Sequence, residues 1–262
     1  MLIKDLAICI RAIDYSETSQ ILTFFTRDTG KIGAIAKGSK RPKSAFGGPF
    51  EIFSCGKIVF AESDKDKLST LTEFDPAPAS VFAGNCGGAG FSKLSANLFT
   101  LNCCLFGAEL LNKLTHDYDP HPQLFDDFLQ FLKNANEGGN NPEMLTLLIL
   151  FQLSLLKETG LQPVLSHCVN CKTRHEKQGT RHEIYFSSSV NGLICRDCEA
   201  SFPDKIRLSP NAANCLSNLK LLTGARGKTL KEIEKLLTYH FTETLGQKPK
   251  MAKYVLNSQF PP

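Results

Sequence analysis

Four cysteines in the second half of the chain have types and spacing that can bind a metal ion. Cys168 and Cys171 form one C-x-x-C pair, Cys195 and Cys198 form a second, and 23 residues separate the pairs. A C-x-x-C pair places two thiolates on one tight turn, and two pairs complete the tetrahedral sulfur set that zinc accepts. Because four protein ligands close the coordination sphere, the pattern predicts one structural Zn²⁺ ion.

Other uses of these cysteines need features that the sequence lacks. Disulfides need an oxidising compartment, and redox C-x-x-C motifs are expected near a βαβ pattern. A zinc deaminase would have proline before the second pair, where this chain has Ile194. His167, His175 and His182 are alternative ligands, but we expect them to be solvated loop residues.

The segment between the two pairs predicts the element that brings them together. Residues 182–189, HEIYFSSS, alternate as a β-strand does, and Asn191-Gly192 is typical of a hairpin turn. The second pair would therefore return beside the first on a small zinc ribbon at about residues 165–202. Helical patterns flank this segment, so we expect the ribbon to be inserted between helices of one bundle.

The composition of the chain indicates its cellular location more clearly than its function. The formal net charge of +4 is mildly basic, and Lys4, Asp5 and Arg11 interrupt any apolar run that could serve as a signal peptide. The most apolar segment, residues 144–156, is too short to cross a bilayer. We expect a soluble cytoplasmic protein with no membrane partner. The other cysteines lie mostly in apolar runs, where free thiols behave as small buried hydrophobes: Cys9, Cys55, Cys86, Cys103, Cys104 and Cys215.

Residues 1 to about 75 predict a small β-barrel. Short segments rich in Ile, Val, Phe and Thr alternate with Gly, Pro and Asp turn signals, which is the pattern of a closed all-β domain. An OB-fold is the simplest candidate, although an SH3-like barrel has the same periodicity. The expected strands cover residues 2–12, 20–26, 31–36, 50–60 and 68–74.

One loop of this barrel is strongly cationic. In residues 37–43, KGSKRPK, four of seven residues are basic and none is acidic. Cations in an irregular loop can follow a phosphate backbone, and nearby aromatic rings can stack on bases, so the pattern indicates sequence-independent nucleic-acid binding. The alternative is a solvated loop beside core phenylalanines, and for Phe25 and Phe53 we expect the core. The cations are Lys37, Lys40, Arg41 and Lys43, and the flanking aromatic residues are Phe24, Phe25, Phe46, Phe50 and Phe53.

Helical periodicity takes over after a proline-containing linker at residues 75–79. The predicted fold class is therefore α+β, with an OB-fold domain at residues 1–79 and a helical bundle domain at 80–262 that carries the zinc insertion. Asn141 is the expected N-cap of the third helix, and Thr229 with Glu232 the expected capping box of the last one. The predicted helices cover residues 91–114, 124–135, 143–159, 211–222 and 230–245.

Three sequence motifs of the chain, in the same order along the sequence, resemble motifs of a known family. T-R-D-T-G-K-I at residues 26–32 precedes A-K-G-S-K-R-P-K-S-A-F-G-G-P-F-E at 36–51, and L-x-x-x-G-L-x-P at 156–163 precedes the first cysteine. The chain resembles the RecO family of DNA-repair recombination mediators over its whole length. The resemblance implies an OB-fold followed by a helical domain with, in many members, a four-cysteine zinc knuckle.

The resemblance also implies a non-enzymatic function. RecO-like proteins bind single- and double-stranded DNA, anneal complementary strands and work with RecR to load RecA onto strands coated by the single-strand-binding protein, whose acidic C-terminal tail they are thought to contact. We therefore expect a nucleoid-associated protein. Carried onto this chain, the phosphate contacts would be Lys37, Lys40, Arg41 and Lys43, with Arg27, Lys31 and Arg11 as weaker candidates, and the tail would meet Lys228, Lys231 or Lys235.

Two other functions are compatible with the same residues. An OB-fold RNA-binding protein with a structural zinc knuckle would have the same barrel and the same cations. A zinc-dependent enzyme that modifies nucleic acid would need an open coordination position and a nearby base, for which Glu176 and Glu183 are the candidates.

Overall fold

The computed structural model describes residues 1–62, 68–76, 91, 93–174 and 183–257. It consists of two compact units, one formed by residues 1–97 with 111–138 and the other by 98–110 with 139–262. The predicted domain boundary at residues 79 and 80 lies outside the described residues and stays a prediction. Among the described residues, none of the helices combines the length and hydropathy that crossing a bilayer requires.

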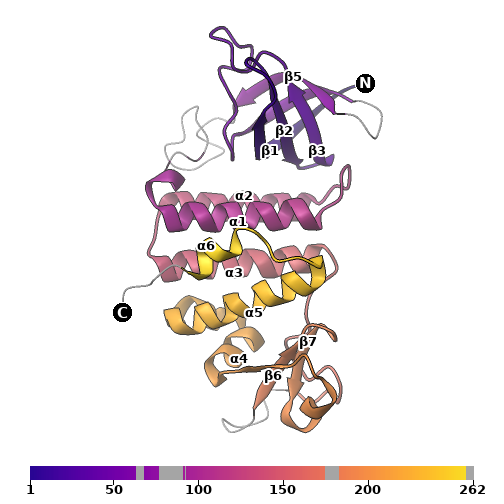
Figure 1. Ribbon diagram of the computed structural model, residues 1–262, viewed down its shortest axis with the longest axis vertical. Helices are drawn as coiled ribbons and strands as arrows, with labels where there is room; N and C mark the ends of the chain where they lie inside the picture. Colours follow the sequence, from indigo (N-terminus) through magenta and orange to yellow (C-terminus); the bar gives the residue numbers. More distant parts are fainter. Residues whose placement is uncertain (63–67, 77–90, 92, 175–182, 258–262) are drawn as a thin grey trace. The chain divides into compact units, whose positions relative to one another are not determined.

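The first unit contains the predicted barrel (Figure 1). Its strands close in the order β1-β2-β3-β5-β4, an OB-like arrangement in which β3 and β5 are parallel and the other neighbours antiparallel. The prediction of a five-stranded barrel is confirmed, although the fourth strand begins five residues later than expected, at Cys55. The strands are β1 (Leu2–Asp14), β2 (Gln20–Thr26), β3 (Gly30–Ala36), β4 (Cys55–Ala61) and β5 (Ser69–Pro76).

Side chains of β2 and β3 alternate between the barrel interior and its outer surface, as a period of two requires. Leu22, Phe24, Ile32 and Ala34 are completely buried in the barrel core. Phe25 points the other way and packs on Phe125 of α2 (Pro122–Glu137), with ring centroids 6.0 Å apart. Helix α2 thus covers one face of the barrel within this unit.

The β2–β3 turn is fixed by the carboxylate of Asp5 on one side and by the backbone of Asp119 on the other. The carboxylate of Asp5 accepts hydrogen bonds from the backbone N–H groups of Asp28 and Thr29 and from the Thr29 hydroxyl. Gly30 has φ of +86°, and a Cβ atom there would collide with the backbone of Asp119. The positive φ angle and the lack of space for a Cβ atom each require glycine at position 30.

The second unit is mainly helical and carries the ribbon. Helix α1 (Leu98–Leu114) is shared, because its residues 98–110 belong to this unit and the rest to the first. The predicted helix at 211–222 is divided into α4 (Pro210–Ser217) and the 3-10 helix η4 (Leu219–Gly224). The remaining elements are α3 (Asn141–Glu158), α5 (Gly227–Leu245) and α6 (Ala252–Leu256), the strands β6 (Ile184–Ser187), β7 (Gly192–Cys195) and β8 (Ile206–Leu208), and the 3-10 helices η1 (Leu94–Ala96, in the first unit) and η3 (Arg196–Ser201).

Two predicted helix caps are wrong. The N-cap of α3 is Asn140, one residue earlier than predicted, and its side chain forms a capping box with Glu143. Helix α5 begins at Gly227, before the predicted capping box, and Glu232 accepts hydrogen bonds instead from the N–H and hydroxyl of Ser209, the N-cap of α4. Glu232 thus bonds to a residue distant in sequence and not to Thr229 of its own helix. The spacing of Thr229 and Glu232 alone cannot reveal this.

A polar pair is buried between α3 and α5. The Gln152 amide donates a 2.9 Å hydrogen bond to Oε1 of Glu234, and both side chains are completely buried. Burial raises the pKa of Glu234 to about 8, so its carboxyl group is neutral at pH 7. Oε2 of Glu234 and Oε1 of Gln152 have no other partner among the described residues. A protonated Oε2 is a donor and the Gln152 oxygen an acceptor, so the neutral acid suits this site.

We predict that Glu234→Gln removes a pH dependence of stability. The folded-state pKa lies above the ordinary value of 4.5, so the contribution of Glu234 to stability is fully present below about pH 4.5 and is lost as the pH rises through about 8. The slope should approach about 1.4 kcal/mol per pH unit in that range. Urea unfolding at pH 5, 6.5 and 8 should show an advantage of the variant that grows with pH. An equal difference at all three pH values would contradict a neutral Glu234.

Candidate metal centre and nucleic-acid interface

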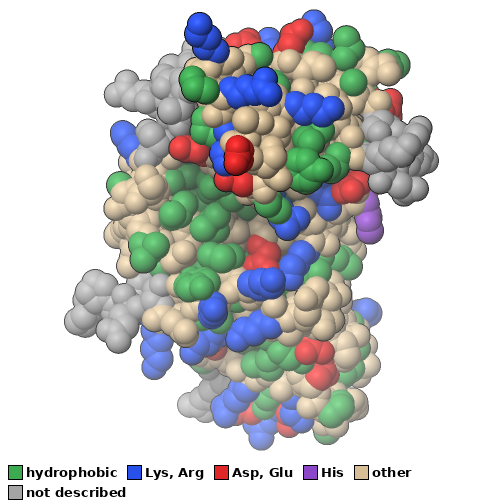
Figure 2. All heavy atoms as spheres, turned by 45° about the horizontal axis from the view of Figure 1, so that its top comes forward, with side chains coloured by type: hydrophobic (Ala, Val, Ile, Leu, Met, Phe, Trp, Pro, Cys, Tyr) green, Lys and Arg blue, Asp and Glu red, His purple; other side chains and the backbone are tan. Residues whose placement is uncertain are grey.

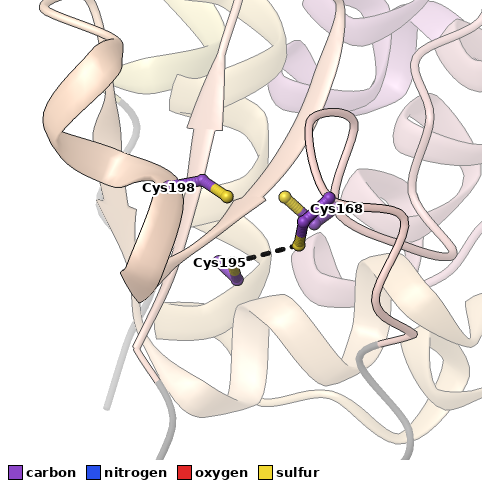
Figure 3. A group of neighbouring side chains, drawn as sticks. Cys168, Cys195 and Cys198 are labelled. Atoms are coloured by element: carbon purple, nitrogen blue, oxygen red, sulfur yellow. Dashed lines mark hydrogen bonds between the residues drawn. The ribbon is translucent and has the colours of Figure 1, made fainter.

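The ribbon brings the four predicted cysteines together. Cys195 ends β7 and Cys198 lies in η3, while Cys168 and Cys171 belong to the turn that precedes the ribbon. Figure 3 shows the sulfur atoms of Cys168, Cys195 and Cys198 pointing toward one another from these two sides. The predicted β-ribbon is therefore the element that joins the two pairs.

Backbone hydrogen bonds fix the first pair beside β7. Val164 exchanges hydrogen bonds with the strand, its N–H donating to Asn191 and its carbonyl accepting from Leu193, both at 2.9 Å. The N–H of Val169, next to Cys168, donates to the Leu193 carbonyl at 2.9 Å. Asn191 itself has φ of +51°, a left-handed conformation that Asn tolerates in a hairpin turn.

The sulfur positions suit a tetrahedral metal ion. All four sulfur atoms lie within 4.8 Å of one another, and those of Cys171 and Cys195 are 3.6 Å apart. Metal–sulfur bonds of about 2.3 Å in a tetrahedron would place sulfurs about 3.8 Å apart. The amide of Asn170 lies 3.3 Å from the Cys198 sulfur and can donate a hydrogen bond to it. Four thiols at these distances can hold one metal ion.

One thiol of the cluster differs electrostatically from the other cysteines of the chain. Hydrogen bonding to Thr173 lowers the pKa of Cys171 to about 6, so this exposed thiol ionises at neutral pH. Burial raises the pKa of Cys9 and of Cys55 to about 12, and it also raises those of Cys103, Cys104 and Cys215. Burial also raises the pKa of Cys195 to about 12, so position and not acidity separates the core thiols from the cluster, and metal binding would displace the Cys195 proton. Cys86 lies outside the described residues.

The alternative ligands and bases receive no support from the described residues. His167 is not part of the sulfur group, and its Nδ1 lies 3.0 Å from the Ser166 hydroxyl. Glu183 accepts a hydrogen bond from Tyr185, which with the neighbouring Arg207 lowers the pKa of its carboxyl group, a poor property for a general base. His175, Glu176 and His182 lie outside the described residues.

We predict that the chain binds one thiophilic metal ion through these four sulfurs. Titration with Co²⁺ should produce thiolate-to-cobalt absorption that saturates at one ion per chain. Cys195→Ser should weaken binding by more than about tenfold, because it removes one of four thiolate ligands. Cys215→Ser is the matched control, since Cys215 is buried outside the cluster. Unchanged cobalt binding by Cys195→Ser would disprove this ligand set.

The basic loop at residues 37–43 is well ordered. Its backbone is tied to the β1–β2 turn, because the N–H of Gly38 donates to the Ser19 hydroxyl at 3.3 Å and the N–H of Lys40 to the Thr18 carbonyl at 3.1 Å. The buried Ser39 hydroxyl donates a 3.0 Å hydrogen bond to the amide oxygen of Gln20. Gly38 has φ of +75°, which explains a glycine there.

The four loop cations are not equivalent. Lys37, Arg41 and Lys43 are exposed, whereas the ammonium of Lys40 lies 2.6 Å from the carboxylate of Asp14. In Figure 2, Lys and Arg side chains on the barrel are interspersed with hydrophobic ones and a few acidic ones. The loop thus presents three cations whose charged ends have no acidic partner among the described residues, on a hydrogen-bonded backbone.

Most of the predicted stacking phenylalanines are core residues. Phe24 and Phe50 are 0% and 5% exposed and pack edge to face inside the barrel, which corrects their expected place beside the loop. Phe25 and Phe53 are buried as expected, Phe53 against Phe128 of α2. Phe46 is half-buried against Phe50. Bases would have to stack elsewhere.

The three weaker cation candidates have different environments. Arg27 donates two hydrogen bonds to Asp126, at 3.1 and 2.9 Å, and this contact raises its pKa. The Lys31 ammonium lies 2.8 and 2.7 Å from the carbonyls of Asn112 and Thr115, and its side chain is only 12% exposed. Arg11 is exposed on β1. Arg27 and Lys31 are engaged within the protein, whereas Arg11 can reach a ligand.

We predict that Lys31 contributes to stability and not to DNA binding. Lys31→Met keeps the apolar stem but leaves the Asn112 and Thr115 carbonyls without this donor, which should cost about 1–3 kcal/mol. Chemical unfolding should show that loss, while DNA affinity stays unchanged. Arg11→Met is the control and should unfold like the wild type. A Lys31→Met variant with normal stability and weakened DNA binding would contradict this assignment.

The predicted partner cations share one stretch of the second unit. Lys228, Lys231 and Lys235 lie on the first turns of α5 at spacings of three and four residues, which places them on one side of the helix. Lys228 and Lys235 are exposed and Lys231 is half-buried.

Comparison with protein families accounts for nearly the whole chain. The family model described as "Recombination protein O N terminal" matches residues 1–78, and that described as "Recombination protein O C terminal" matches residues 95–253. The chain belongs to the RecO family. The two matches cover the barrel and the helical region with its cysteine cluster, as the sequence resemblance implied.

Curated relatives agree with RecO-family membership. The "DNA repair protein RecO" of Bacillus pumilus is 31% identical over 97% of this chain and 94% of its own length. That of Bacillus subtilis is 30% identical with the same coverage, and that of Anaeromyxobacter sp. (strain K) is 30% identical over 83% of this chain and 77% of its own length. Family identity supports a role in DNA repair and recombination.

Proposed function

We propose that this RecO-family chain is a non-catalytic recombination mediator. It would bind single- and double-stranded DNA, anneal complementary strands and, with RecR, help to load RecA onto DNA coated by single-strand-binding protein. The observation that carries the proposal is the ordered cationic loop at residues 37–43 on an OB-like barrel. The DNA contacts would be Lys37, Arg41 and Lys43, with the exposed Arg11 of β1 as a further candidate.

Annealing by such a surface needs charge and no acid–base chemistry. Two DNA strands repel each other through their phosphates, and cations held on a fixed backbone offset that repulsion while leaving the bases free to pair. Binding would release counterions and would therefore weaken steeply with salt. No nucleotide hydrolysis is expected.

The metal would have a structural role. Cys168, Cys171, Cys195 and Cys198 would hold one Zn²⁺, whose d¹⁰ shell accepts four thiolates in a tetrahedron. A closed four-sulfur site leaves no position for substrate. Its contribution would be to fix the connection between α3 and α4 through the ribbon.

The helical unit would supply the contact with single-strand-binding protein. The acidic C-terminal tail of that protein would meet cations on the first turns of α5, and Lys228 and Lys235 are the exposed candidates. Lys231 lies between them on the same side of the helix.

The alternative of an RNA-binding OB protein makes a different prediction for competition. An RNA-binding protein should release DNA when structured RNA is added at equal nucleotide concentration, whereas a DNA mediator should retain it. Family membership favours the DNA role.

We predict that Lys37/Arg41/Lys43→Ala loses annealing of complementary strands precoated with single-strand-binding protein. Removal of three phosphate contacts should also reduce the slope of log affinity against log salt by about 2 for single strands. Lys40 is retained because its loss would leave Asp14 without its ion-pair partner. Circular dichroism checks that the variant is folded.

The matched control removes three exposed cations from the second unit, as Lys220/Arg226/Lys248→Ala, and carries the same net charge. It should anneal like the wild type. If the control loses annealing of both coated and uncoated strands and the loop variant does not, the DNA site lies on the C-terminal helices. If the wild type neither binds nor anneals DNA, the mediator proposal is wrong.

A further inference from the structure

The β1–β2 turn exposes an aromatic ring beside the basic loop. Tyr15, between β1 and β2, is 64% exposed, whereas Phe24, Phe25 and Phe50 are buried. It is the exposed aromatic side chain among the described residues of the barrel. A single exposed ring is common on protein surfaces, so its meaning depends on whether it belongs to a larger apolar surface.

The turn holds this ring on an ordered backbone. The N–H groups of Tyr15 and Ser16 donate to the Ser19 carbonyl at 3.0 and 3.2 Å. The hydroxyl of Ser16 accepts in turn from the N–H groups of Thr18 and Ser19, at 3.3 and 3.1 Å. The backbone that carries Tyr15 is therefore fixed, while its side chain remains exposed.

The same turn is joined to the basic loop. Lys40 contacts it twice, through its ammonium to Asp14 at 2.6 Å and through its N–H to Thr18 at 3.1 Å. The N–H of Gly38 reaches the Ser19 hydroxyl. The tyrosine and the exposed loop cations thus belong to one continuous surface.

An apolar row continues this surface across the sheet. Ile13 on β1 pairs with Ile21 on β2, which pairs with Ile35 on β3, so the three side chains lie side by side on the outer face. Ile13 is 41% exposed, and Ile21 and Ile35 are half-buried. Neighbouring Leu22 is buried in the core, as the alternation of strand residues requires.

Cations border the row on both sides. A register shift between Cys9 and Arg11 turns Arg11 outward, although Cys9 two residues earlier is in the core. Arg11 pairs with Thr23 in the row adjacent to the isoleucines, and Lys37 directly follows β3 two residues beyond Ile35. Glu17 is an exposed acid in the turn and opposes phosphate there.

Apolar and aromatic groups flanked by cations match the chemistry of an unpaired nucleotide strand. Bases of a single strand offer faces for stacking and its phosphates need cations, whereas a duplex hides its base faces. We propose that Tyr15 stacks on an unpaired DNA base, with Ile13, Ile21 and Ile35 forming the apolar floor beside it. This inference rests on the proposed DNA-binding function and assigns the ring a preference for single strands.

The test compares Tyr15→Ala, Tyr15→Phe and wild type on three probes: an oligo(dT) strand, the same strand with abasic sites, and a duplex of equal length. Tyr15→Ala should bind oligo(dT) roughly tenfold more weakly, in the range expected for loss of one stacked base. Tyr15→Phe should stay within about twofold, because it keeps the ring. On abasic strand and on duplex the three proteins should be equal. Glu17→Gln is the matched control in the same turn and should bind at least as tightly as wild type.

Equal binding of oligo(dT) by Tyr15→Ala and wild type would overturn the inference while leaving the mediator proposal intact, provided that the Lys37/Arg41/Lys43→Ala variant loses binding. A loss that is as large on abasic strand as on oligo(dT) would also overturn it, because the ring would then act without a base. If wild type binds none of the three probes, the proposed function itself fails.

Discussion

The side-chain amide of Gln20 holds together the cationic end of the barrel. It is 5% exposed, and its oxygen accepts hydrogen bonds from the N–H of Phe50 at 2.8 Å and from the Ser39 hydroxyl at 3.0 Å. Its nitrogen donates to the Phe50 carbonyl at 3.2 Å. A buried amide without these partners would be costly, so one side chain of β2 fixes both ends of the segment that runs from the basic loop to Phe50. The backbone that carries the loop cations is thereby anchored at Ser39 and at Phe50.

In the ribbon, backbone hydrogen bonds fix the segment that carries the first cysteine pair. Val164 and Val169 bond to the β7 strand and its turn, and these bonds align the two cysteine pairs. A metal ion bound there would add its binding free energy to folding, since the four thiols come together only in the folded chain. In both places local order comes from hydrogen bonds that are independent of a ligand.

Spacing and periodicity predicted the features that depend on local sequence. The four cysteines, the alternation of β2 and β3 and the left-handed Asn191 turn follow from short-range rules, and the structure agrees with them. The roles of individual cations did not follow, because Arg27 finds its partner 99 residues away and Lys31 finds one 81 residues away. Barrel closure likewise decides that Phe24 points into the core, whereas Tyr15, on the turn between β1 and β2, stays exposed.

The residues of the β2–β3 turn belong to a motif that the chain shares with its family, and their side chains have structural roles. The stretch T-R-D-T-G-K-I helps to identify the chain, yet its polar side chains are used inside the protein, by Asp126, by Asp5 and by the Asn112 and Thr115 carbonyls. Gly30 admits no side chain at all. Substitution in this stretch would therefore disturb hydrogen bonds and packing inside the protein. Tyr15, on a solvent-exposed turn, is free of that restriction, so a change there can alter what the barrel surface binds while leaving the fold intact.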